Sequence, residues 1–136
     1  GIWEYDSNLV PVMNSVGSIA LEQSDIISSH HYGPEKDLVT IINGLQQHQR
    51  PLICTEWLAR SEGSTVDNLQ IFSDQNVGAI NWGLVDGKTQ TRFPWRSWWE
   101  EVNEEEPWFH ELLHFDGIPY SEYESSAFQR ITKLHL

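Results

Sequence analysis

Positive charge is scarce in this chain of 136 residues, which has 8 Lys and Arg against 20 Asp and Glu and a formal net charge of -12. Nucleic acids and anionic membranes are bound by clusters of Lys and Arg, so neither is an expected partner. An uncharged ligand is compatible with this net negative charge. Some of the acid lies in one run, Glu100–Glu101 and Glu104–Glu106, and such a run is typical of a solvated surface segment.

Cysteine, long apolar runs and several catalytic motifs are missing as well. Cys54 is the only cysteine, which excludes an internal disulfide. No segment approaches the ~20 apolar residues that a membrane-spanning helix needs. A Gly-rich phosphate-binding loop and a Gly-x-Ser-x-Gly elbow are also missing, and Cys54 lies among apolar neighbours. Phosphate-binding proteins and enzymes with a serine or cysteine nucleophile are therefore poorly supported.

Tryptophan, by contrast, is abundant, with 7 residues in this short chain. Trp fills hydrophobic cores, but its flat face also stacks on the apolar faces of sugar rings. The N–H at the edge of the ring can form a hydrogen bond at the same time. Composition alone leaves both uses open.

Three largely apolar segments predict parallel strands, near 25–32, 51–57 and 77–83. Apolar residues at helical spacing follow the first two, over 35–49 and from Ser64 or Thr65 through Asn76. Strands that alternate with helices through short turns form parallel βαβ units. The segment 84–120 has no clear periodicity, a closing helix is expected near 121–135, and residues 1–5 are a candidate for the end of a further strand.

Polar side chains gather where the predicted strands end, which is the edge of a parallel sheet where ligands bind. The second strand ends at Glu56, and alternation places Leu52, Cys54 and Glu56 on one face. If Leu52 and Cys54 face the interior of a barrel, Glu56 lies at the top of that interior. A carboxylate there can attack the anomeric carbon of a sugar and form a covalent glycosyl-enzyme. Alternatively, Glu56 caps a helix or pairs with Arg60.

The ends of the other two strands supply candidate substrate-binding residues. Tyr32 can donate to the nucleophile and keep it ionised, and His30 can bind a sugar hydroxyl, although both could simply face water. Trp82 is either the platform beneath a sugar ring or a core residue. Further candidates for contacts with sugar are Asn81, Lys88, Gln90 and Trp95. His30 and His31 point apart as neighbours in a strand and no third ligand is evident, so neither a metal nor another cofactor is expected.

In order and spacing, these segments resemble strands six, seven and eight of retaining (β/α)8-barrel glycoside hydrolases, the clan that includes cellulases, mannanases and β-galactosidases. Residues 25–32 end in the His-x-Tyr of the sixth strand, and residues 50–57 resemble the seventh strand with its nucleophile. Residues 81–85 and 87–91 are similar to the eighth strand and its loop in bacterial cellulase-family or xylanase-like glycosyl hydrolases. The resemblance covers most of residues 24–110.

The resemblance implies an α/β fold that is the C-terminal part of a (β/α)8 (TIM) barrel, about strands five to eight, in a hydrolase of β-linked glycans. It assigns Glu56 as the nucleophile, His30 and Tyr32 as residues beside it, and Trp82 as the sugar platform. The acid/base Glu of the clan follows an Asn at the end of the fourth strand, but the only Asn-Glu pair here is Asn103–Glu104.

A complete barrel takes about 250 residues. The resemblance therefore implies a part-barrel that holds one of two catalytic carboxylates and needs the missing N-terminal half or self-association. The compartment stays open, with a secreted or periplasmic bacterial protein as one candidate. Two alternatives remain: a non-catalytic carbohydrate-binding or structural half-barrel, and an unrelated α/β domain in which Glu56 is structural.

Overall fold

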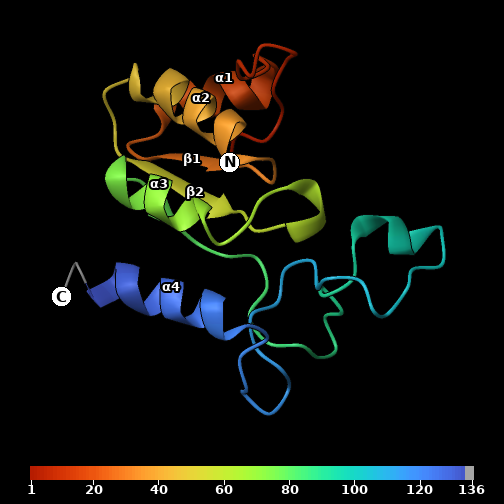
Figure 1. Cartoon of the computed structure of the whole chain (residues 1–136). Coiled ribbons are helices and arrows are strands. Elements are labelled where there is room, and N and C mark those ends of the chain that lie inside the picture. Colours follow the sequence, from red (N-terminus) through yellow and green to blue (C-terminus); the bar gives the residue numbers. More distant parts are fainter. Residues whose placement is uncertain (134–136) are drawn as a thin grey trace.

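The computed structural model describes residues 1–133, except for the side chain of Ser15, and its helices and strands alternate along residues 15–79 (Figure 1). The elements are α1 (Ser15–Gln23), β1 (Ile27–His30), α2 (Glu35–Gln46), β2 (Leu52–Glu56), the 3-10 helix η1 (Arg60–Glu62), α3 (Asn68–Asp74), β3 (Gly78–Ala79), the 3-10 helix η2 (Trp95–Trp98) and α4 (Glu122–Lys133). The three strands are parallel and lie in the order β1-β2-β3. The protein is therefore a small α/β domain with a three-stranded parallel sheet.

The third strand is much shorter than the predicted segment 77–83. Beyond Ala79 the chain leaves the sheet, because the Asn81 side chain donates to the carbonyl oxygens of Gly83 and His110. Gly83 also packs closely on His110, where a Cβ atom would lie 2.8 Å from the histidine Cβ. These contacts turn the chain out of the sheet immediately after β3.

Two helices also differ from their predicted bounds. The helix expected from Ser64 or Thr65 through Asn76 is α3, which begins at Asn68. The Ser64 hydroxyl instead accepts hydrogen bonds from the backbone N–H of Leu58 and the side chain of Asn68. The closing helix is α4, and positions 134 and 135 of the predicted range lie outside the described residues.

The first residues of the chain lie beside β1, where the end of a further strand was expected. Ile2 bridges Ser29 in parallel, with its N–H 2.8 Å from the Ser28 carbonyl oxygen. The N–H of His30 donates to the Ile2 carbonyl at 2.8 Å. Residues 1–5 therefore extend the sheet beyond β1 by a single bridge.

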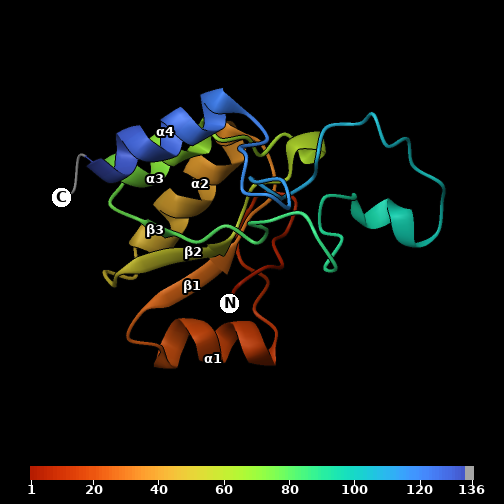
Figure 2. The same cartoon turned by 90° about the horizontal axis from the view of Figure 1, so that it is seen from below.

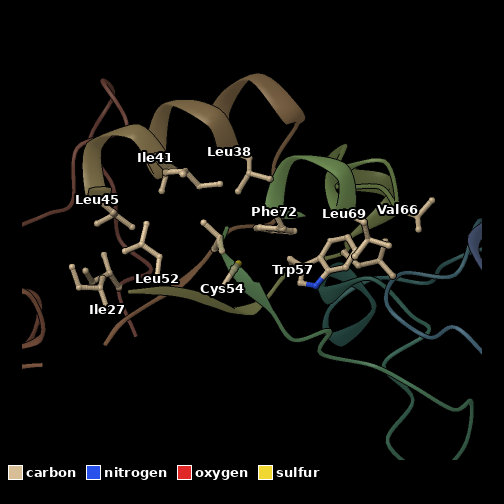
Figure 3. Packing of buried hydrophobic residues seen from close by; sticks show 14 of the residues in the cluster. Ile27, Leu38, Ile41, Leu45, Leu52, Cys54, Trp57, Val66, Leu69 and Phe72 are labelled. Atoms are coloured by element: carbon tan, nitrogen blue, oxygen red, sulfur yellow. The ribbon is translucent and has the colours of Figure 1, made fainter. Parts of the chain in front are cut away.

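The core lies between the sheet and the helices that cover one of its faces. Leu38, Ile41, Ile42 and Leu45 repeat at the spacing of one helical stripe, and all four are buried on α2. They face the sheet, where Leu52 points toward them (Figure 3). Burying a leucine or isoleucine side chain stabilises a fold by about 1.5–3 kcal/mol, so this stripe fixes α2 on the sheet.

Leu52 and Cys54 do not face the interior of a barrel together with Glu56. Both are buried in the core under the helices (Figure 3). The pairing of β1 with β2 shifts by one residue, so that Ser29 pairs with Cys54 but His30 pairs with Glu56. Simple alternation therefore fails at the end of β2, because the register irregularity intervenes before Glu56.

The long segment after β3 forms a separate lobe beyond the C-terminal ends of the strands. Figures 1 and 2 both show it extending to one side of the sheet, with η2 at its far end. A parallel bridge between Val85 and Leu113 joins the beginning of this segment to its end, after which the chain enters α4. The strand ends consequently face the inner side of this lobe.

Apolar side chains on the face of the sheet opposite α2 and α3 are exposed among the described residues. Ile26, directly before β1, and Ile80, directly after β3, are 55% and 51% exposed. Both residues of β3 are exposed as well. An uncovered sheet face with a short open edge favours association.

We expect the isolated chain to associate in solution, because contact between copies would shield this face from water. Light scattering should give a mass above the monomer, and the double substitution Ile26→Thr and Ile80→Thr should shift it toward the monomer. The matched control, Phe115→Thr and Ile118→Thr, changes exposed residues of a turn outside the sheet and should leave the mass unchanged. A monodisperse, cooperatively melting monomer would contradict this expectation.

Candidate functional site

A cavity of about 1170 Å³ lies at the C-terminal ends of β1 and β2, under the lobe. Its wall contains Glu56 from the end of β2 and residues 30–32 from the end of β1. The remaining wall comes from Trp3 and Tyr5 near the N-terminus and from the segment 82–110. The cavity thus joins the ends of parallel strands to the loop that follows them.

The Glu56 carboxylate is held by two side chains from the end of β1. The Tyr32 hydroxyl donates to Oε2 at 2.6 Å, and Nδ1 of His30 lies 3.3 Å from the same oxygen. Among the described residues, no hydrogen bond is made to Oε1. One carboxylate oxygen is therefore fixed while the other remains available to a ligand.

Burial sets the protonation of both partners. It raises the pKa of the Tyr32 phenol far above its usual value of 10.0, and the hydrogen bond to Glu56 and its charge raise it further. Burial also lowers the pKa of His30 below 6.5, against the opposing charge of Glu56. Near neutral pH, Tyr32 is therefore a donor to Glu56, and His30 is uncharged beside the carboxylate.

Exposed tryptophans line the same cavity as the carboxylate. Trp82, Trp95, Trp98 and Trp3 all line the cavity, and Trp82 and Trp98 are 54% and 80% exposed. Trp95 also packs edge-on against the Tyr32 ring, with a centroid distance of 5.0 Å. Trp82 is thus a cavity residue and not a core residue, and its ring is open to a ligand.

Six of the eight residues predicted from the sequence meet at this cavity. They are Glu56, His30, Tyr32, Trp82, Gln90 and Trp95. Asn81 and Lys88 are not part of its wall: the Asn81 carboxamide holds the turn after β3, and Lys88 is exposed. His31, the weaker candidate, also lines the cavity, and its N–H donates to the Glu56 carbonyl at 3.0 Å.

Several cavity residues have no signal in the sequence, because they belong to segments without periodicity. His110 is 1% exposed, with Nδ1 2.5 Å from the Leu58 carbonyl oxygen. Its Nε2 has no hydrogen-bond partner among the described residues. Glu100, Glu101 and Glu104, in the run that is typical of a solvated surface, are exposed but line the cavity. A loop folded back over the strand ends brings both groups to the site.

Other chemistries find little support at this site. Burial raises the pKa of the Cys54 thiol to about 11, so the thiol stays protonated near neutral pH. Within residues 1–133, no three His, Cys, Asp or Glu side chains are grouped to hold a metal ion. Among residues 1–133, none of the helices has the length and apolar character of a membrane span.

Comparison with protein-family models, with curated proteins and with solved structures found no match to this chain. The support for a functional site is therefore the geometry of the cavity and its residues.

The buried histidines predict a loss of stability in acid. Burial lowers the pKa of His31 and His110 below 6.5, and the charge of Arg60 adds to the effect on His110 while that of Glu56 opposes it. The unfolded chain therefore binds protons more readily at these positions. The stability that they contribute is present above about pH 6.5 and is lost as the pH falls through the lowered pKa.

We expect His110→Asn to reduce this loss, because Asn can still donate to the Leu58 carbonyl but cannot be protonated. Urea unfolding at pH 7.5 and 5.5 would measure the free energy of unfolding at each pH. Each unit by which the His110 pKa is lowered accounts for up to about 1.4 kcal/mol of the difference. Burial raises the pKa of Glu111, so this residue makes the fold more stable as the pH falls. The pH dependence of stability is therefore compared between the unsubstituted protein and the variant. His114→Asn, outside the cavity, is the control; an unchanged pH dependence in His110→Asn would contradict the assignment.

Proposed function

We propose that this chain is the nucleophile-bearing, C-terminal part of a (β/α)8-barrel glycoside hydrolase that acts on a β-linked glycan with retention of configuration. One observation carries the proposal: a Glu56 carboxylate held by Tyr32 and His30 in a tryptophan-lined cavity at the ends of parallel strands. This is the location where enzymes with parallel α/β architecture bind their ligands.

In the proposed reaction, Oε1 of Glu56 attacks the anomeric carbon of a bound sugar. A covalent glycosyl ester forms as the bond to the leaving oxygen breaks, and that oxygen takes a proton from a general acid. The Tyr32 hydroxyl donates to Oε2 and Nδ1 of His30 lies beside it, which limits rotation of the carboxylate. Water then cleaves the ester and regenerates Glu56.

Retention requires a second carboxyl group about 5–5.5 Å from the nucleophile. The described polar contacts of the Glu56 carboxylate are to Tyr32 and His30, neither of which is a carboxylic acid. Glu100, Glu101 and Glu104 share the cavity but lie in an exposed loop, and the resemblance matches none of them to the acid. The proposed general acid belongs to the part of the barrel that precedes this chain.

Glu56 should be labelled by a 2,4-dinitrophenyl 2-deoxy-2-fluoro-β-glycoside, because its good leaving group needs little protonation. Mass spectrometry of peptides should place the adduct on Glu56 in the protein and in the control Glu62→Gln, but not in Glu56→Gln. Unactivated glycans should be cleaved slowly by this chain, since loss of general acid catalysis costs about 10²–10⁴-fold. Labelling elsewhere, or rapid turnover of an unactivated glycan, would contradict the proposal.

A second candidate function is carbohydrate binding without catalysis, which the four exposed tryptophans favour independently of Glu56. Such a protein would bind a glycan through its aromatic faces and leave the sugar intact. The two candidates make the same prediction for the tryptophans and opposite predictions for the labelling of Glu56.

Trp82→Ala should weaken binding of a neutral β-linked hexasaccharide about tenfold, because truncating a stacked aromatic residue costs roughly 1–2 kcal/mol. Isothermal titration calorimetry would measure the affinity. Trp99→Ala is a matched control, since Trp99 is exposed on the same lobe but is not part of the cavity wall. Equal affinities of the two variants would remove Trp82 from the binding site. Binding without labelling of Glu56 would favour the non-catalytic candidate.

A further inference from the structure

The wall of the cavity is negatively charged. Four glutamates line it, Glu56, Glu100, Glu101 and Glu104, and no Lys or Arg is among the described residues that do so. Glu100 forms an ion pair with Arg96 at 2.9 Å, which partly balances its charge. Glu101 and Glu104 form no ion pair within residues 1–133. Their charges therefore act on whatever enters the cavity.

The histidines of the wall do not offset this charge. Burial lowers the pKa of His30, of His31 and of His110, so all three are uncharged near neutral pH. The cavity consequently keeps a net negative charge from its glutamates.

A buried hydrogen-bond acceptor in the same wall also favours ligands that donate hydrogen bonds. The Leu58 carbonyl can only accept, so the 2.5 Å contact places a proton on Nδ1 of His110. Nε2 of this uncharged ring is then an acceptor, and it is buried without a hydrogen-bond partner in residues 1–133. A buried acceptor of this kind is matched by a donor such as a hydroxyl or ammonium group, whereas an ionised carboxylate offers only acceptors.

We infer that Glu101 and Glu104 are specificity-determining residues of the cavity. They favour sugars that are rich in hydrogen-bond donors, either uncharged or amino sugars, and they disfavour sugars that carry carboxylates. The inference rests on the proposed function and names the substrate class of that same site. Two unit charges several ångströms apart in water change an affinity by roughly two- to fourfold. Two glutamates facing a glycan with several carboxylates should therefore weaken its binding by about tenfold or more.

The test compares glycans that differ only in charge. β-1,4-linked hexasaccharides of glucose and of mannose are titrated in neutral form and with each C6 oxidised to a carboxylate, together with a hexamer of glucosamine. Affinities are measured by calorimetry at pH 7.5 in 20 mM and in 500 mM NaCl. Glu101→Gln with Glu104→Gln is compared with Glu105→Gln and Glu122→Gln, a pair of exposed glutamates outside the cavity wall that changes the net charge equally.

At low salt, the protein should bind a neutral or glucosamine hexamer at least tenfold more tightly than the oxidised hexamers. Glu101→Gln with Glu104→Gln should improve binding of the oxidised hexamers about tenfold and leave the neutral ones within twofold, while the control pair changes neither. The discrimination should shrink in 500 mM NaCl, because salt screens exposed charges. Equal binding of neutral and oxidised hexamers would overturn the inference but not the proposed function. Equal effects of the cavity pair and the control pair of substitutions would do the same. If none of the hexamers binds, the proposed function fails and the inference fails with it.

Discussion

The rest of the structure depends on the buried guanidinium group of Arg60, just beyond the end of β2. It donates to the Glu124 carboxylate at 2.8 and 2.5 Å, and to the carbonyl oxygens of Trp108 at 2.6 Å and Glu111 at 2.9 Å. Its carbon lies 4.6 Å from the centre of the Tyr120 ring. One side chain thus joins the sheet to α4 and to the returning end of the lobe. Removing one partner from such a buried pair typically costs about 3–5 kcal/mol, because the other charge is left unpaired.

This anchor explains how an irregular segment can form one wall of a site. Because the carbonyls of Trp108 and Glu111 are fixed by Arg60, the residues between them are held over the strand ends. Phe109 and His110 contact Trp95 there, with ring centroids 4.8 and 5.9 Å away, and Trp95 in turn packs on Tyr32. The position of the Tyr32 hydroxyl, and with it that of the Glu56 carboxylate, therefore depends on packing that begins at Arg60.

The sequence predicts features that depend on neighbouring residues, and it does not predict features that depend on contacts between distant segments. Apolar periodicity is local, so it locates the parallel strands and the polar residues at their ends, such as Glu56 and Tyr32. It cannot locate His110 or Glu101, since their positions depend on contacts between distant segments of an aperiodic loop. Alternation along β2 also fails at Glu56, because a register shift depends on the neighbouring strand. Pairing of Glu56 with Arg60 was one local alternative, and the structure pairs Arg60 with Glu124 instead.

The contacts of Glu56 support the proposed catalytic role over the alternative proposal of binding alone. A carboxylate that only binds sugar gains most from two free oxygens, because each can accept hydrogen bonds from neighbouring hydroxyls. Here the Tyr32 hydroxyl donates to Oε2 and Nδ1 of His30 lies 3.3 Å from it, which leaves Oε1 in a defined direction. Fixing one oxygen sacrifices binding capacity but limits rotation about the carboxylate, and nucleophilic attack depends on such alignment. The tryptophans, by contrast, serve binding and catalysis equally, so the hydrogen bond from Tyr32 is the feature that separates the two functions.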